Sequence, residues 1–232
     1  FASLFSHSDN HETIIRTLAT VRKGMTRNQI LDRSKVSSGG TLTKTLDELE
    51  DSGFIEKYLP YKGTKDSVYR LSDEYSMFYI RFIENTKPSK QGIWMKRQAL
   101  QEYKIWAGFS FETICMKHID QIKDGLKVAG VISTHGSWIE KSKSNGAQID
   151  LLIDRDDNVI NLCEMKFHNT PFALDKKYAL EVENKKNVFV AETHAKKSIF
   201  ITFITTYGLV PNQYNKQYVQ KELTMDHLFA EL

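Results

Sequence analysis

Three early segments of the chain carry apolar residues, which recur every three or four positions in the first and the third. The first segment spans 10–21, the second spans 27–34, and the third lies between Gly40 and Gly53. This spacing places the apolar side chains on one face of a helix. The apolar positions are Ile14, Ile15, Leu18, Val21, Ile30, Leu31, Leu42, Leu46 and Leu49. The pattern predicts three consecutive amphipathic helices, with Gly53 ending the third.

Two short apolar segments follow, FIEKYLP at 54–60 and SVYRLS at 67–72. The polar stretch between them, YKGTKD, contains the glycine and aspartate that tight turns favour. These segments therefore predict a two-stranded hairpin. Three helices and a hairpin are the element order of a winged helix, so we expect residues 1–86 to form an α+β winged-helix domain with a trailing helix.

Two interpretations of this winged helix remain open. In a DNA-binding version, the third helix enters the major groove and the hairpin contacts phosphates. The lysines available for this role are Lys44, Lys57, Lys62 and Lys65. The third helix also carries four carboxylates, which would repel a phosphate backbone: Asp47, Glu48, Glu50 and Asp51. A spacer or protein-docking role is the alternative.

An aromatic-rich stripe at helical spacing follows the hairpin. It consists of Tyr75, Phe78, Tyr79, Phe82 and Ile83. We interpret the stripe as core rather than as a binding surface, because residues at this spacing usually pack inside. The polar segment 84–92 then interrupts regular structure with Pro88 and Gly92, and it predicts a boundary before a second domain at 93–232.

The second domain begins with a predicted helix over 94–123. Glu112 lies on an otherwise apolar face of this helix, where a carboxylate is costly unless it meets a proton, a cation or a metal. The next segments predict strands at 137–142, 146–155 and 158–167, then a helix at 176–195 and a strand at 198–208. We therefore expect an α/β domain with a mixed central sheet flanked by helices.

Strand alternation brings candidate catalytic residues together. Residues two apart on a strand share a face, so Asp150 on one strand and Glu164 on the next can converge if the two strands pair. Lys166 would lie beside them, and the helix would supply Glu112. Two carboxylates can hold Mg²⁺ or Mn²⁺ through oxygen, and a lysine can position water or stabilise charge on a phosphate.

Three segments resemble the PD-(D/E)xK nuclease superfamily, whose fold is that of restriction endonucleases. They are FSFETI at 109–114, QIDLLID at 148–154 and NLCEMKF at 161–167. The resemblance places Asp150, Glu164 and Lys166 on the family's metal and catalytic positions, and Glu112 on its helical carboxylate. The proline that the family has before its aspartate is replaced by Ile149.

The order winged helix, aromatic helix and nuclease-like domain also resembles the C-terminal region of a family of archaeal and bacterial AAA-type ATPases. The resemblance covers essentially the whole chain. It implies an N-terminal ATPase domain in cis. No GxxxxGK[ST] phosphate loop occurs in this sequence, which indicates that the ATPase domain is not part of it. It says little about biological role.

Composition agrees with a cytoplasmic protein that does not cross a membrane. The chain has 232 residues, of which 41% are hydrophobic and 26% charged, and no apolar run approaches the roughly 18 residues of a membrane span. The net charge of +3 does not by itself indicate a nucleic-acid partner. No feature of the sequence indicates an oligomeric state.

Several functional interpretations of the second domain follow. The main hypothesis is a Mg²⁺- or Mn²⁺-dependent phosphodiesterase that acts on DNA. One alternative is an ordinary ion pair between Lys166 and its neighbouring carboxylates on a solvated sheet face. Another is a non-catalytic regulatory module that binds DNA or a protein. An RNA substrate is less favoured, because the sequence lacks the stacked aromatic pattern of single-stranded RNA readers.

Overall fold

A computed structural model describes most of the chain. The described residues are 8–37, 39–62, 66–84, 86, 92–140 and 146–231. The chain divides into two compact units, one made of Phe1–Leu59 with Thr64–Phe109 and the other of Pro60–Gly63 with Ser110–Leu232. This division lies between Phe109 and Ser110, whereas the sequence predicts a domain boundary upstream, between residues 86 and 93.

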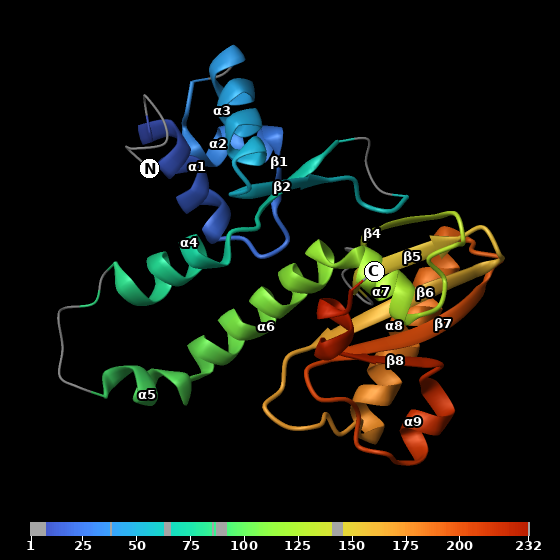
Figure 1. The fold of residues 1–232 in the computed structure, drawn as a ribbon. Coiled ribbons are helices and arrows are strands. Elements are labelled where there is room, and N and C mark those ends of the chain that lie inside the picture. Colours follow the sequence, from blue (N-terminus) through green and yellow to red (C-terminus); the bar gives the residue numbers. More distant parts are fainter. Residues whose placement is uncertain are drawn as a thin grey trace. The chain divides into compact units, whose positions relative to one another are not determined.

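The first unit contains the helices and the hairpin that the sequence predicts (Figure 1). Its elements begin with α1 (Ser8–Ala19), β1 (Met25–Thr26), α2 (Arg27–Ser34), α3 (Gly40–Asp51), β2 (Ile55–Tyr58) and β3 (Val68–Leu71). The strands form an antiparallel sheet in the order β1-β3-β2. The apolar faces of the three helices supply the core, in which Ile14, Ile30 and Leu42 are fully buried.

A capping box sets the start of α2. The Thr26 side chain accepts a hydrogen bond from the backbone N–H of Gln29, and the Gln29 side chain accepts one from the backbone N–H of Thr26. These reciprocal bonds satisfy amide groups that have no partner within the helix. The local sequence thus fixes where this helix begins.

Gly24 is expected to be the least replaceable glycine of the first unit. Its φ is +74°, and a Cβ atom there would clash with the backbone oxygen of Tyr69 and lie 2.8 Å from Cγ1 of Val68. Gly53 has nearly the same φ, +75°, but a Cβ atom would meet nothing within 4 Å. Gly24→Ala should therefore lower the free energy of unfolding by about 2 kcal/mol and Gly53→Ala by about 1 kcal/mol. Urea denaturation of both variants measures the difference, and equal losses would show that crowding at Gly24 is unimportant.

The aromatic-rich helix is formed by α4 (Glu74–Phe78), which continues as the π-helix η1 (Tyr79–Ile83). Phe82 is buried, and Phe78 packs against Trp94 and Trp106 with ring centroids 5.1 and 5.2 Å away. The prediction that the whole stripe is core is wrong for three of its members, since Tyr75, Tyr79 and Ile83 are exposed.

The helix turns these three residues outward because Ser76 and Met77 take its buried positions. The first unit then continues through α5 (Ile93–Gln98) into α6 (Gln101–Lys117).

A five-stranded mixed sheet flanked by helices forms the second unit. Its order is β4-β5-β6-β7-β8, with antiparallel pairing up to β6 and parallel pairing beyond it. The strands are β4 (Ser133–Glu140), β5 (Ala147–Arg155), β6 (Val159–Lys166), β7 (Ser198–Thr205) and β8 (Lys221–Thr224). The accompanying helices are α7 (Ile119–Gly125), α8 (Lys176–Thr193), α9 (Gln213–Tyr218) and the 3₁₀-helix η2 (Met225–Phe229).

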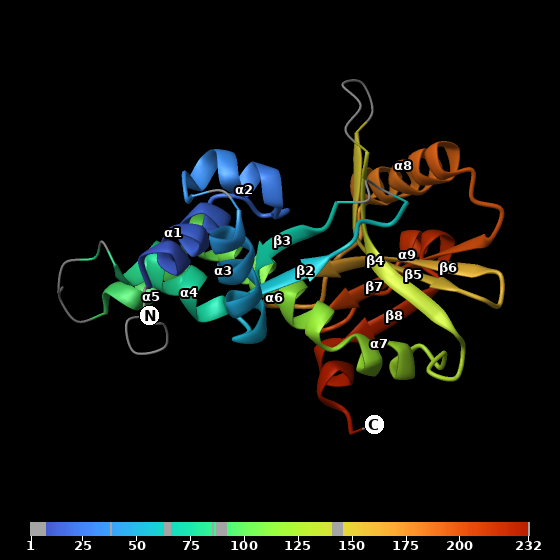
Figure 2. The same ribbon diagram turned by 90° about the horizontal axis from the view of Figure 1, so that it is seen from above.

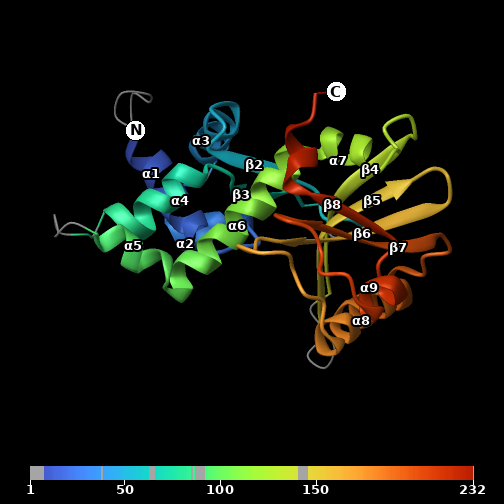
Figure 3. The same ribbon diagram turned by 60° about the horizontal axis from the view of Figure 1, so that its bottom comes forward.

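Two apolar layers cover opposite faces of this sheet, with α7 on one side and α8 on the other (Figures 2 and 3). On the first face, Cys115 of α6 packs with Leu151 and Cys163. On the second face, Phe189 of α8 packs with Leu152 and other apolar strand residues. Among the described helices, none is long and apolar enough to cross a membrane.

Candidate functional site

Asp150 and Glu164 lie where two strands of the sheet cease to pair. The ladder between β5 and β6 runs from Asp154, opposite Ile160, to Leu151, opposite Cys163. The next position in the same register places Asp150 opposite Glu164, on the sheet face that α8 covers. Glu164 is close enough for its charge to raise the pKa of Asp150. The two carboxylates therefore converge, as strand alternation predicts.

Glu164 is held by two side chains of α8. It is only 3% exposed, so its carboxylate needs compensating donors. The Tyr178 hydroxyl donates to Oε2 at 2.8 Å, and the Lys185 ammonium donates to Oε1 at 2.5 Å. Burial, followed by the charge of Glu164, raises the pKa of Tyr178, which keeps its hydroxyl protonated as a donor.

Lys166 stands beside this cluster rather than inside it. Its Nζ lies 3.8 Å from Oε2 of Glu164 and 5.1 Å from the centroid of the Tyr178 ring. The side chain keeps 31% of its surface exposed, compared with 4% for that of Glu164. The ammonium is therefore positioned by Glu164 and Tyr178 while it remains accessible from solvent.

Asp150 is the second carboxylate of the pair. Its Oδ1 accepts a hydrogen bond from Nε2 of Gln148 at 2.7 Å. Burial and the charge of Glu164 raise its pKa, whereas Lys185, Lys166 and the bond from Gln148 oppose the rise. Burial and the neighbouring carboxylate thus both disfavour the ionised form of Asp150.

Asp150→Asn is expected to stabilise the metal-free protein increasingly as the pH rises. Because the folded-state pKa of Asp150 is raised, the folded protein binds this proton more tightly than the unfolded chain. Stability from the protonated form is fully present below the unfolded pKa of about 3.9, and it is lost as the pH rises through the folded pKa. Urea titrations with a chelator should give the variant an advantage of about 1 kcal/mol at pH 8 and none near pH 4. A difference that does not depend on pH would contradict this assignment.

Glu112 does not join the carboxylate pair. Its helix packs Phe111 and Cys115 against the sheet face opposite to that of Asp150 and Glu164. The charge of Glu112 contributes to the raised pKa of Cys115, after burial and the charge of Cys163. Within the described residues, no group of three or more His, Cys, Asp or Glu side chains is placed to hold a metal ion. The predicted set of Glu112, Asp150 and Glu164 is thus reduced here to its two strand members.

Three of the four lysines predicted to contact nucleic acid lie within the described residues, and they are divided between the two units. Lys44 is highly exposed, with Nζ 3.6 Å from Glu48 of its own helix. Lys57 lies 5.8 Å from the ring centroid of Tyr69 in the first unit. Lys62 belongs to the second unit, where it donates to the backbone oxygen of Thr193 at 3.1 Å. Lys65 lies outside the described residues.

Sequence reasoning missed Tyr178 and Lys185. Asp175 caps the N-terminus of α8 by accepting a hydrogen bond from the backbone N–H of Tyr178. Tyr178 and Lys185 are seven residues apart, so both fall on the same face of the helix. Val182 lies on the buried side between them. This spacing was the available signal, although a helix periodicity does not reveal which strand residue the helix will meet.

Comparisons with known proteins identify no family. No family model matches the chain, and no curated protein matches it. It is similar to a solved structure, that of a protein of unknown function designated AF1548, with a TM-score of 0.34 and 19% sequence identity. The match covers 50% of this chain and 64% of that one, so the chain spans less than two thirds of the length of the protein it resembles.

Proposed function

We propose that the second unit is a metal-dependent DNA phosphodiesterase. The observation that carries the proposal is the convergence of Asp150, Glu164 and Lys166 at the point where β5 and β6 stop pairing. Two adjacent, poorly solvated carboxylates with a partly exposed ammonium beside them suit the binding of a divalent cation and a phosphate.

The order of elements supports the nuclease resemblance. A helix precedes three antiparallel strands, and a second helix then leads to a parallel strand. This order puts the ExK strand, β6, in the middle of the sheet, with Glu164 facing α8. It is the helix and strand order that we expected around the ExK strand of a PD-(D/E)xK nuclease.

The donor set fits Mg²⁺ or Mn²⁺. Asp150 and Glu164 offer oxygen ligands, and burial, followed by the charge of Glu164, raises the pKa of Asp150. A bound divalent cation would supply a water of lowered pKa and would neutralise charge on the scissile phosphate. Glu112 remains a candidate only for an indirect contribution, because its helix packs Phe111 and Cys115 against the other side of the sheet.

Lys166 is the residue that we assign to the reacting phosphate. In hydrolysis a water oxygen attacks phosphorus, the bond to the leaving oxygen breaks, and negative charge grows on the phosphoryl oxygens. An ammonium in this position can donate to those oxygens and stabilise that charge. Tyr178 and Glu164 keep the ammonium in place, and Lys185 satisfies Glu164 from the opposite oxygen.

The order of elements in the first unit supports its interpretation as a winged helix. Three helices precede a hairpin, and β1 adds a third short strand to it. We infer that this unit docks the nuclease-like unit to DNA or to a protein, under the control of an ATPase domain in cis. The acidic outward positions of α3, among them Asp47 and Asp51, favour protein as the partner of that helix.

A second candidate function is a non-catalytic binding module. Both oxygens of Glu164 already accept hydrogen bonds from Tyr178 and Lys185, which leaves this carboxylate satisfied without a metal. In that version the cluster would be a structural ion pair that joins α8 to the sheet. Metal binding and cleavage separate the two candidates.

The test is cleavage of supercoiled plasmid, linear duplex and branched DNA with Mg²⁺ or Mn²⁺. The parent chain is expected to cut at least one of these substrates, and Asp150→Asn is expected to cut none of them. Asp156→Asn serves as a matched control, because Asp156 is an exposed carboxylate in the turn after β5. Cleavage that survives Asp150→Asn would contradict the proposed site.

A further inference from the structure

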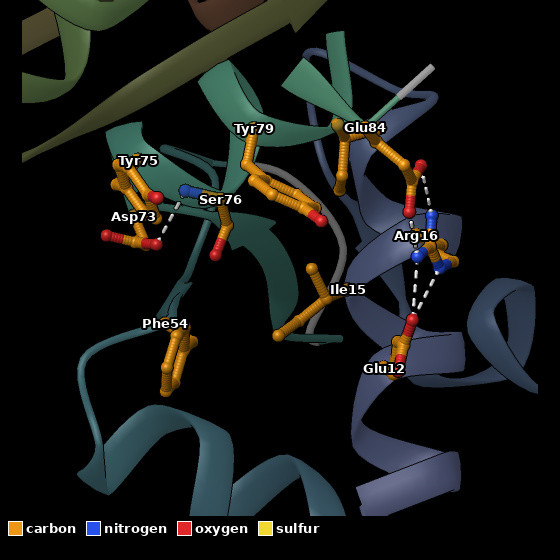
Figure 4. A pocket seen from close by; sticks show the side chains of 10 residues that line it. Glu12, Ile15, Arg16, Phe54, Asp73, Tyr75, Ser76, Tyr79 and Glu84 are labelled. Atoms are coloured by element: carbon orange, nitrogen blue, oxygen red, sulfur yellow. Dashed lines mark hydrogen bonds and ion pairs between the residues drawn. The ribbon is translucent and has the colours of Figure 1, made fainter. Parts of the chain in front are cut away.

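A pocket of about 490 Å³ lies in the first unit, among residues of α1, α4 and η1 (Figure 4). Its size falls within the range of about 300 to 1,000 Å³ that is usual for ligand sites. Ile15, Phe54 and Ile80 are the apolar aliphatic and phenyl members of its lining, which also includes Tyr75 and Tyr79. None of these residues belongs to the candidate phosphodiesterase site.

Two tyrosines keep large exposed surfaces beside this pocket. Tyr75 is 66% exposed and Tyr79 is 40% exposed. Their ring centroids are 6.4 Å apart, and the ring planes are inclined by 39°. Tyr79 also begins the π-helix η1, a rare conformation that is frequently found at functional sites. The exposed aromatic faces would attract a cation through their π electrons.

Carboxylates dominate the charge around the pocket. Its lining includes Glu12, Asp73 and Glu84 but a single cationic side chain, Arg16. The Arg16 guanidinium donates to both Glu12 and Glu84, and the bond to Oε2 of Glu84 measures 2.8 Å. These bonds also lower the pKa of Glu84, so this carboxylate stays ionised.

Asp73 is the carboxylate that Arg16 does not reach. Its Oδ2 accepts a hydrogen bond from the backbone N–H of Ser76 at 2.8 Å and thereby caps α4. Among the described residues, no ion pair joins Asp73 to a cation, whereas Glu12 and Glu84 both pair with Arg16. Three carboxylates against one guanidinium leave the pocket negative, and Asp73 and Tyr75 both belong to its lining.

We propose that this pocket binds an arginine or lysine side chain presented by a peptide segment of a partner protein. The cation would lie against Tyr75 and Tyr79 and near Asp73, while the apolar walls would take a neighbouring apolar side chain of the peptide. The charge complementarity excludes a phosphate backbone, which the same carboxylates repel. Peptide binding here would not depend on phosphodiester cleavage by the second unit.

The test uses NMR titration of the full chain with the peptide acetyl-Leu-Arg-Leu-amide. The matched probe is the same peptide with citrulline, which keeps the shape of arginine and lacks its charge. The ring signals of Tyr75 and Tyr79 are expected to shift saturably with the arginine peptide, and the citrulline peptide should bind at least tenfold more weakly.

Two variants locate the binding. Asp73→Ser removes the charge but keeps a residue that caps helices well, and it should weaken binding of the arginine peptide at least fivefold. Asp47→Asn removes one carboxylate from α3, away from the pocket lining, and should leave the affinity unchanged.

Three results would overturn the proposal. They are equal binding of the two peptides, the same loss of affinity in both variants, and shifts of the tyrosine signals with a single-stranded oligonucleotide instead of the peptide.

Discussion

Lys166→Met is expected to slow Mn²⁺-dependent DNA cleavage by about a hundredfold to a thousandfold while the protein remains folded. The substitution removes the ammonium that we assign to the phosphate but retains a side chain of similar length. The lost contact to Glu164 spans 3.8 Å, and Lys166 is 31% exposed, so the effect on stability should be small. Initial rates on the substrate that the parent cuts provide the measurement.

Lys177→Met is the matched control for Lys166, because Lys177 is an exposed lysine in the first turn of α8. It removes the same charge from the same unit and should change the rate by less than about threefold. Equal losses in the two variants would show that Lys166 contributes only to the general attraction of DNA. Retained cleavage in Lys166→Met would remove this lysine from the proposed chemistry.

Lys185→Met is expected to lower the free energy of unfolding by about 2 to 3 kcal/mol. It leaves the carboxylate of Glu164, which is 4% exposed, without the ammonium that now lies 2.5 Å from Oε1. We place the loss below the roughly 3 to 5 kcal/mol typical of broken buried pairs, because Lys185 itself is 25% exposed. Urea denaturation with a chelator present measures the change.

A double variant separates the charge effect from lost packing. If the cost of Lys185→Met is an uncompensated charge, Lys185→Met combined with Glu164→Gln should recover most of the stability. The Tyr178 hydroxyl could still donate to the amide oxygen that Glu164→Gln introduces, so this hydrogen bond need not be lost. Additive losses in the double variant would instead show that the two side chains do not interact energetically.

Local sequence patterns were sufficient to predict the strand pair and the sheet face on which its two carboxylates lie. Hydrophobic alternation around Leu151 and Cys163 assigns these residues to one face, and it leaves Asp150 and Glu164 on the other. The period of two is a property of the backbone, so a correct strand assignment also predicts which side chains can meet. The early helices could be predicted equally well, because leucines such as Leu42 mark their buried faces.

Contacts between distant elements could not be predicted in the same way. Tyr178 and Lys185 reach Glu164 only because α8 packs over β6. The sequence predicts this helix but not the strand on which it packs. The position of Glu112 relative to the strands could not be predicted for the same reason, because the spacing of residues around it does not specify which sheet face α6 covers. Tyr75 and Tyr79 were assigned to the core because their spacing is that of a buried helix face, whereas both side chains are exposed.

Calorimetric titration of the full chain with Mn²⁺ tests the central claim most directly. We expect one site in the micromolar to millimolar range, and Asp150→Asn should weaken it at least tenfold. Glu112→Gln should leave the affinity nearly unchanged, because the helix of Glu112 packs Phe111 and Cys115 against the opposite face of the sheet. A parent chain that binds no Mn²⁺ would contradict a metal site at Asp150 and Glu164. An Asp150→Asn variant that binds Mn²⁺ as tightly as the parent would contradict it as well.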